Sequence, residues 1–188
     1  GMQFTKADGS KVTQKDGFIR DAKAIDLAQP IENGPVDAGF DYFFGNAACP
    51  TTDYLYAYIE NRHLVEKPTL ADPGGQYIPG QPMTEYRAGA RAPGFDLETV
   101  DLTLLDKSTG FIEQHVRQSP QQPFFLYHAL CAAHMPILPA RQFRGKSEAG
   151  LYGDFVMEAD WVVGELVKTV DKLGIANDTL ILFTSDNG

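Results

Sequence analysis

The sequence predicts an α/β fold with a parallel-sheet βαβ core. Two continuous apolar runs, residues 124–130 and 179–184, have the length and composition of buried strands. Between them, residues 148–173 repeat apolar side chains at spacings of three and four, which is the pattern of one helix face. Because a strand–helix–strand unit within one sheet places its two strands parallel, we expect 124–130 and 179–184 to be parallel strands.

The first half of the chain predicts loops with short strands. Residues 1–25 are polar and show no clear period, so we treat them as a poorly defined lead-in. Residues 30–95 are rich in turn formers, in stretches such as PIENGP and KPTLADPGGQYIPGQP. Within this region YLYAYIENRHLV, at 54–65, alternates enough to predict a strand or a hairpin. A loop region of this length indicates a functional segment or a fold with neighbouring parts missing.

Two helices are predicted in the second half. Residues 97–118 carry a partial apolar stripe, and QSPQQP ends this helix. The stripe of the longer helix, 148–173, consists of Leu151, Phe155, Ala159, Val162, Leu166, Val170 and Leu173. Gly174 is a suitable C-terminal stop. We expect the acidic residues of this helix to form its solvated face.

Composition excludes some classes of protein. The 188 residues are enough for one domain, and their formal net charge of −9 argues against a nucleic-acid binder, which needs a basic face. No apolar run reaches the roughly 18 residues of a membrane span. The polar start lacks the apolar core of a signal peptide. Cys49 and Cys131 are too few for a disulfide scaffold and form one bridge or none.

Polar residues follow both predicted strands. In open α/β sheets, ligands bind beyond the carboxyl ends of the strands. His134 follows the first strand, whereas Asp186 and Asn187 follow the second, so parallel strands would bring them to one edge. A carboxylate and an amide oxygen suit Ca²⁺ or Mg²⁺, although Asp-Asn-Gly is also a common turn. Cys131 near His134 allows a Cys–His nucleophile, but a buried thiol is favoured.

Three stretches carry a resemblance to a known family. GFDYFFG at 39–45, PFFLYHALCAAHMP at 123–136, and the block at 150–188 that ends in TSDNG resemble the type I sulfatases. This arylsulfatase family has an alkaline-phosphatase-like fold. The resemblance covers 26–188, so we interpret residues 1–188 as a partial sulfatase catalytic domain.

The resemblance implies hydrolysis of sulfate esters on a sulfated small molecule or a sulfated carbohydrate. It implies a bound calcium ion, a formylglycine nucleophile, and a periplasmic or secreted location. Asp186 and Asn187 match the family's Asp-Asn calcium ligands. His134, in AHMP, matches the histidine that touches the sulfate group.

The departures from the family pattern concern the nucleophile. Formylglycine forms in a Cys/Ser-x-Pro/Ala-x-Arg motif, but Cys49 heads CPTTD and Cys131 heads CAAHM. The family's N-terminal aspartate pair and its G-K-W-H segment are also absent from these 188 residues. We therefore expect an internal part of a sulfatase domain that is inactive alone and binds calcium weakly. The alternatives are a phosphoryl-transfer relative of the same superfamily and a non-catalytic truncated or split-gene product.

Overall fold

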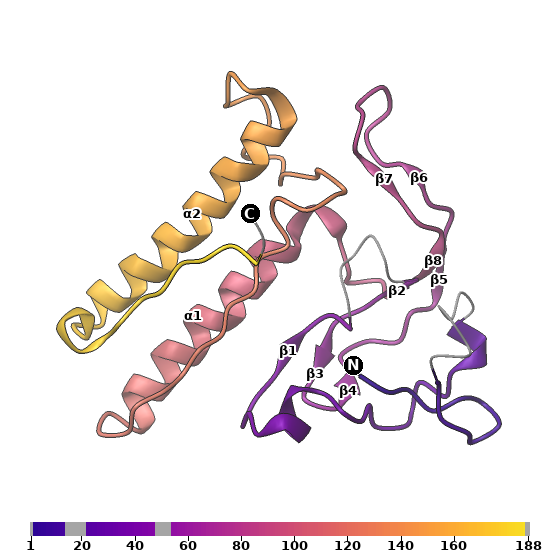
Figure 1. Ribbon diagram of the computed structural model, residues 1–188, viewed down its shortest axis with the longest axis horizontal. Helices are drawn as coiled ribbons and strands as arrows, with labels where there is room; N and C mark the ends of the chain where they lie inside the picture. Colours follow the sequence, from indigo (N-terminus) through magenta and orange to yellow (C-terminus); the bar gives the residue numbers. More distant parts are fainter. Residues whose placement is uncertain (1, 14–21, 48–53, 187–188) are drawn as a thin grey trace.

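The computed structural model describes residues 2–13, 22–47 and 54–186. Two long helices, α1 (Val100–Gln118) and α2 (Gly150–Lys172), pack against each other on one side of the molecule. The short strands of the first half lie on the other side (Figure 1). The described residues also form four 3₁₀ helices: η2 (Ala22–Ala24), η3 (Pro35–Ala38), η4 (Leu97–Thr99) and η5 (Ala176–Asp178).

The strands form small sheets, as the turn-rich sequence predicts. One sheet has the order β1-β3-β4, made of β1 (Phe44–Gly45), β3 (Ile59–Glu60) and β4 (His63–Leu64). A second has the order β2-β8-β5, made of β2 (Leu55–Tyr56), β8 (Gly89–Arg91) and β5 (Leu70–Asp72). The third pairs β6 (Gly75–Gln76) with β7 (Glu85–Tyr86). The hairpin predicted within 54–65 is confirmed, because β3 and β4 are antiparallel with Ile59 opposite Leu64.

Both predicted helices are confirmed. The side chain of Asp96 accepts a 3.0 Å hydrogen bond from the Glu98 N–H and caps the 3₁₀ turn that leads into α1. Along α2 the most buried apolar residues are Phe155, Val162 and Val170, all members of the predicted stripe. Gly174 adopts the left-handed conformation just beyond the end of α2, as a C-terminal stop requires.

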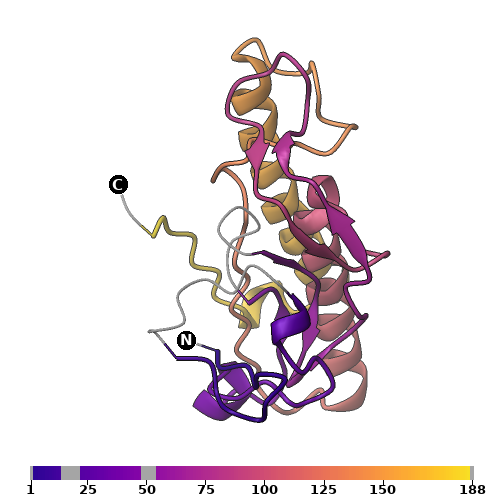
Figure 2. The same ribbon diagram turned by 90° about the vertical axis from the view of Figure 1, so that its right-hand side faces the viewer.

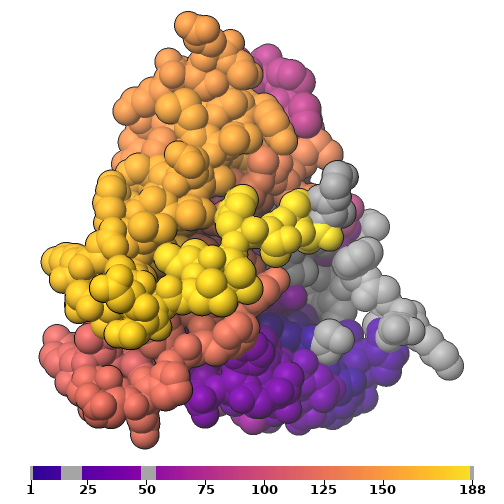
Figure 3. Space-filling model, turned by 60° about the vertical axis from the view of Figure 1, so that its left-hand side comes forward, coloured from indigo at the N-terminus to yellow at the C-terminus, as the bar shows by residue number. Residues whose placement is uncertain are grey.

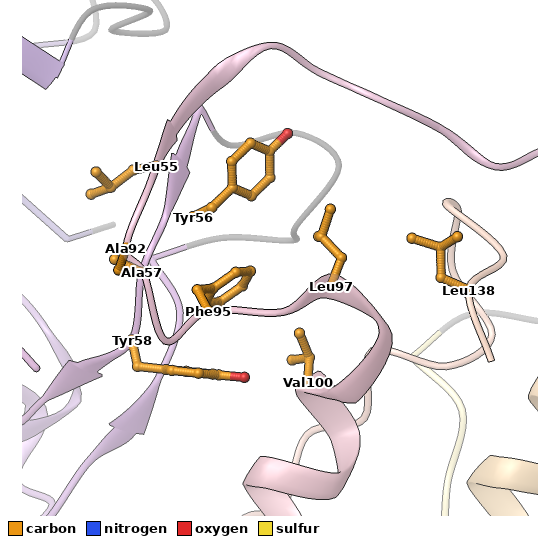
Figure 4. Close-up of a cluster of buried hydrophobic side chains, with 9 residues drawn as sticks. All are labelled: Leu55, Tyr56, Ala57, Tyr58, Ala92, Phe95, Leu97, Val100 and Leu138. Atoms are coloured by element: carbon orange, nitrogen blue, oxygen red, sulfur yellow. The ribbon is translucent and has the colours of Figure 1, made fainter. Parts of the chain in front are cut away.

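The main apolar cluster joins the strand region to the start of α1. It contains Leu55, Tyr56, Ala57, Tyr58, Ala92, Phe95, Leu97, Val100 and Leu138 (Figure 4). The rings of Tyr58 and Phe95 lie 4.8 Å apart. Each fully buried side chain of this size contributes about 1.5–3 kcal/mol to folding. Leu138 belongs to the segment after residue 130, so this cluster also anchors the part of the chain that carries His134.

Among the described residues, the predicted pair of parallel strands is not formed. Residues 124–130 and 179–184 are extended, but neither belongs to a sheet of the described residues. Phe125 is 75% exposed and Leu182 is 82% exposed. The C-terminal segment (yellow) extends away from the helices in Figure 2 and lies on the surface in Figure 3. A β-strand needs a neighbouring strand to pair its backbone N–H and C=O groups. An apolar run in the sequence predicts that a segment is buried, but it does not predict which strand pairs with it.

The segment at 124–130 nevertheless has the side-chain alternation of a strand. Its more buried residues are Phe124, Leu126, His128 and Leu130, and the residues between them are exposed. The more buried face lies against α1: the rings of Phe124 and Phe111 are 6.1 Å apart. His128 Nδ1 and Ser108 Oγ are 2.8 Å apart. One face of this segment is therefore covered by a helix and the other is open.

In the described parts of the chain, no helix is both long and apolar enough to cross a membrane.

Candidate functional site

The segment from Cys131 to Ala140 carries His134 and is held at its start by α1. Asp101, in the first turn of α1, is 2% exposed and accepts two backbone hydrogen bonds. The N–H of Cys131 donates to Oδ1 at 2.7 Å, and the N–H of Ala132 donates to Oδ2 at 2.9 Å. Both carboxylate oxygens are therefore used to fix the point where the chain leaves the extended segment.

The far end of the same segment is held by α2. Glu158 is 1% exposed, and its Oε2 accepts a 2.6 Å hydrogen bond from the N–H of Ala140. Arg144 adds a second link, since its Nε donates to the carbonyl of Pro139 at 3.0 Å. Its guanidinium also lies 3.0 Å from a carboxylate oxygen of the buried Glu98.

Asp154 continues this pattern one helical turn before Glu158. Its carboxylate accepts from the N–H groups of Gly145, Lys146 and Ser147, at 2.8, 3.1 and 2.7 Å. Residues four apart lie on the same helix face, so Asp154 and Glu158 are directed toward the same neighbouring chain segment. The expectation that the acidic residues of this helix are solvated is therefore wrong for these two, which are both buried.

His134 lies on the surface of the segment between these anchors. Its Nδ1 is 2.7 Å from the carbonyl oxygen of Met135, and its backbone N–H donates to the Cys131 carbonyl at 2.9 Å. A carbonyl oxygen only accepts hydrogen bonds, so Nδ1 carries the hydrogen of this contact. In the neutral ring Nε2 then bears the lone pair, whereas in the charged ring it is a second donor.

A small pocket lies beneath His134. It is lined by Leu97, Glu98, Val100, Asp101, Cys131, His134, Met135, Pro136, Leu138, Phe155 and Glu158. Its volume of about 20 Å³ is that of roughly one water molecule. A sulfated sugar cannot fit inside, so this pocket is not a substrate cavity.

Burial dominates the electrostatics of the pocket. It raises the pKa of Asp101, and the hydrogen bonds from Cys131 and Ala132 oppose that shift. Burial also raises the pKa of Glu158 from 4.5 to about 7. The N–H of Ala140 and the charge of Arg144 lower the pKa of Glu158, whereas the charge of Asp101 raises it further. The two acids therefore resist ionising together.

Of the two predicted calcium ligands, the structure describes Asp186 alone. Asp186 is exposed, and Asn187 lies outside the described residues. A carboxylate and an amide oxygen suit calcium chemically, but they supply two or three of the six to eight ligands that calcium takes. Within 2–13, 22–47 and 54–186, no group of three or more His, Cys, Asp or Glu side chains could hold a metal ion. The roles of His134, Asp186 and Asn187 stay predictions.

The structure combines a mixed α/β architecture with a histidine on a segment that two helices hold. Comparison with known proteins identifies the class of protein to which this arrangement belongs. The sulfatase family model matches residues 15–188, so the chain belongs to the sulfatase family. The resemblance stated from the sequence is confirmed.

Two relatives and one solved structure illustrate the match. The N-acetylgalactosamine-6-O-sulfatase of Bacteroides thetaiotaomicron is 30% identical over 156 residues, which are 83% of this chain and 28% of that protein. The N-acetylgalactosamine-6-sulfatase of Mus musculus is 35% identical over 155 residues, which are 82% and 27%. A solved structure from work on glycosaminoglycan metabolism by Bacteroides thetaiotaomicron superposes with a TM-score of 0.65 and 24% identity. The alignment covers 88% of this chain and 42% of that one, which supports the sulfatase, alkaline-phosphatase-like fold. The chain thus spans little more than a quarter of these two relatives.

Proposed function

We propose that this chain is part of the catalytic domain of a sulfuric ester hydrolase that acts on a sulfated carbohydrate. The observation that carries the proposal is the family match over residues 15–188, which includes His134 and the segment that holds it. The two relatives described above are named for a sulfate ester on N-acetylgalactosamine. Their names favour a carbohydrate over another sulfated small molecule. The location we propose, periplasmic or secreted, rests on the family resemblance alone.

His134 would act at the sulfate group. Its Nδ1 lies 2.7 Å from the Met135 carbonyl oxygen, a contact that orients the ring, and Nε2 would be the nitrogen that meets the substrate. A charged ring at this position donates a hydrogen bond to a sulfate or ester oxygen. It can also pass that proton to the leaving oxygen, a contribution worth about 10²–10⁴ in rate.

Asp186 and Asn187 would hold calcium together with ligands from sequence outside this chain. When bound, the ion supplies Lewis-acid stabilisation of the charge that develops on the sulfate oxygens. The formylglycine nucleophile would also come from outside, because neither Cys49 nor Cys131 heads the required motif.

We also propose that 124–130 and 179–184 are strands of a sheet completed by other parts of a longer protein. Two observations support this. The side chains of 124–130 alternate between a face covered by α1 and an open face that carries Phe125 and Tyr127. The relatives are more than three times as long as the region matched here, so they contain ample sequence for neighbouring strands.

The test uses a protein that contains this chain and is as long as the sulfatase relatives. Its activity is assayed on an N-acetylgalactosamine 6-sulfate oligosaccharide in the presence of calcium. His134→Ala should lower kcat at least 100-fold. His63→Ala, which changes an exposed strand residue, is the matched control and should leave kcat unchanged. The 188-residue chain alone should show no turnover.

Other outcomes separate the alternatives. Hydrolysis of the corresponding phosphate ester but not the sulfate ester would favour a phosphoryl-transfer relative. Absence of both activities in the longer protein would favour a non-catalytic product. Turnover by the 188-residue chain that is lost in His134→Ala would show that the nucleophile lies within it.

A further inference from the structure

Two buried carboxylates from different helices hold the two ends of the segment that carries His134. Asp101 of α1 binds the backbone at Cys131 and Ala132, and Glu158 of α2 binds it at Ala140. The three donor–acceptor distances lie between 2.6 and 2.9 Å, so all three are close N–H···O hydrogen bonds.

We infer that Asp101 and Glu158 are positioning residues that fix the backbone on both sides of His134. This inference deepens the proposed function and rests on it, because it gives His134 its place at the sulfate group. Neither carboxylate would touch the substrate, since both are buried below the segment and His134 is on its surface.

Packing alone does not require acids at these two positions. Burying a carboxylate costs free energy that an apolar side chain of similar size does not. The acids accept the N–H groups of a segment that has no regular secondary structure and would otherwise leave those donors unpaired. A midpoint contact supports the same arrangement, because the N–H of Ile137 donates to the carbonyl of Met83 at 2.7 Å.

Asp101 and Glu158 together form a clamp on the segment that carries His134. The equilibrium between the closed and the opened clamp should depend on pH through Glu158. The titratable or charged groups around it are Asp101 of α1, Glu98 of η4, Cys131 and His134 of the segment, and Arg144 just after the segment. Burial raises the pKa of Glu158 to about 7 in the closed state, whereas a hydrated glutamate in an opened segment titrates near 4.5. Linkage then requires that raising the pH through this window favours opening.

The test measures amide hydrogen exchange by NMR at the N–H groups of Cys131, Ala132 and Ala140 in the 188-residue chain. Asp101→Ala should speed exchange at Cys131 and Ala132, and Glu158→Ala should speed it at Ala140, each by at least 10-fold. Exchange within α2 should stay the same in both variants. The matched controls, Asp106→Ala and Asp160→Ala, remove exposed acids from the same two helices and should change none of these rates.

The isosteric variant Glu158→Gln separates positioning from simple loss of folding. It keeps an acceptor for Ala140, so protection at that amide should persist, but its dependence on pH between 5 and 8 should disappear after correction for intrinsic exchange. The ring signals of His134 should be single and sharp in this variant and broadened or doubled in Glu158→Ala.

The inference is overturned if these three amides exchange in Asp101→Ala and Glu158→Ala at the same rates as in the control variants. It is also overturned by a Glu158→Gln variant that keeps the wild-type pH profile, even if Glu158→Ala fails to fold. None of these measurements needs turnover. If the longer protein is inactive, the proposed function is refuted. The hydrogen-exchange measurements then still test whether Asp101 and Glu158 hold the segment.

Discussion

Replacing Glu158 by Gln should change how the stability of the chain depends on pH. Burial raises the pKa of Glu158 from 4.5 to about 7, so the folded protein holds this proton over a range in which the unfolded chain has lost it. Each pH unit of that difference corresponds to about 1.4 kcal/mol, so Glu158 should lower the free energy of unfolding by about 3 kcal/mol between pH 4.5 and 7.

The sign follows from the direction of the shift. Because the folded pKa is raised, stability is fully present below the unfolded pKa and is lost as the pH rises toward the folded one. Glutamine cannot ionise, so the variant should lack this loss. Its stability relative to wild type should therefore rise by about 3 kcal/mol between roughly pH 4.5 and pH 8.

Urea unfolding of both proteins at several pH values measures this difference, provided that the dependence on urea concentration is the same for both. Asp160→Asn is the control, because Asp160 is exposed on the same helix. A Glu158→Gln difference that stays constant to within about 0.5 kcal/mol across the range would refute the reasoning, since it would mean that Glu158 titrates normally.

Three further outcomes are expected. Asp154→Ala removes a buried carboxylate that accepts three backbone N–H groups and should cost about 2–4 kcal/mol in urea unfolding, whereas Asp160→Ala should cost less than about 0.5 kcal/mol. Replacing the exposed Phe125 and Tyr127 together by Ser should reduce self-association in sedimentation velocity without lowering stability by more than about 0.5 kcal/mol. Calcium titrated calorimetrically into the 188-residue chain should bind weakly. Micromolar binding that is lost in Asp186→Ala would contradict this.

The helices could be predicted because their apolar faces meet within this chain. α1 and α2 pack on each other, so the three- and four-residue spacing along 148–173 corresponds to an interface that is present. The hairpin at 59–64 was predictable for the same reason, since both of its strands are close in sequence. A sequence pattern predicts an element correctly when the surface that buries its apolar face lies within the described chain.

The pairing of the two apolar segments does not follow from the sequence, because neither segment pairs with any of the described strands. The apolar runs at 124–130 and 179–184 indicate segments that require burial, but hydrogen-bonded pairing also requires a neighbour in the right register. The alternation of 124–130 survives in the structure without that neighbour. The pattern therefore identified a strand-like segment, whereas its pairing stays a prediction.

The buried acids were missed because charge on a helix usually marks the solvated face. A signal was present: Asp154 lies three residues after Leu151, and Glu158 lies three residues after Phe155. These spacings place both acids on the edge of the apolar stripe rather than opposite it. What the sequence could not show is which backbone N–H groups they would meet, because the segment at 131–147 has no periodicity of its own.

The position of His134 depends on the packing of the two helices, because its two anchors belong to different ones. Asp101 moves with α1 and Glu158 moves with α2, so the separation of the helices fixes the distance between the points that hold the segment. Val162, which is completely buried on α2, contributes to that packing from a position one turn beyond Glu158. Close-packed interfaces resist small displacements, so a histidine on an irregular and exposed segment gains a defined position from the most regular elements of the fold.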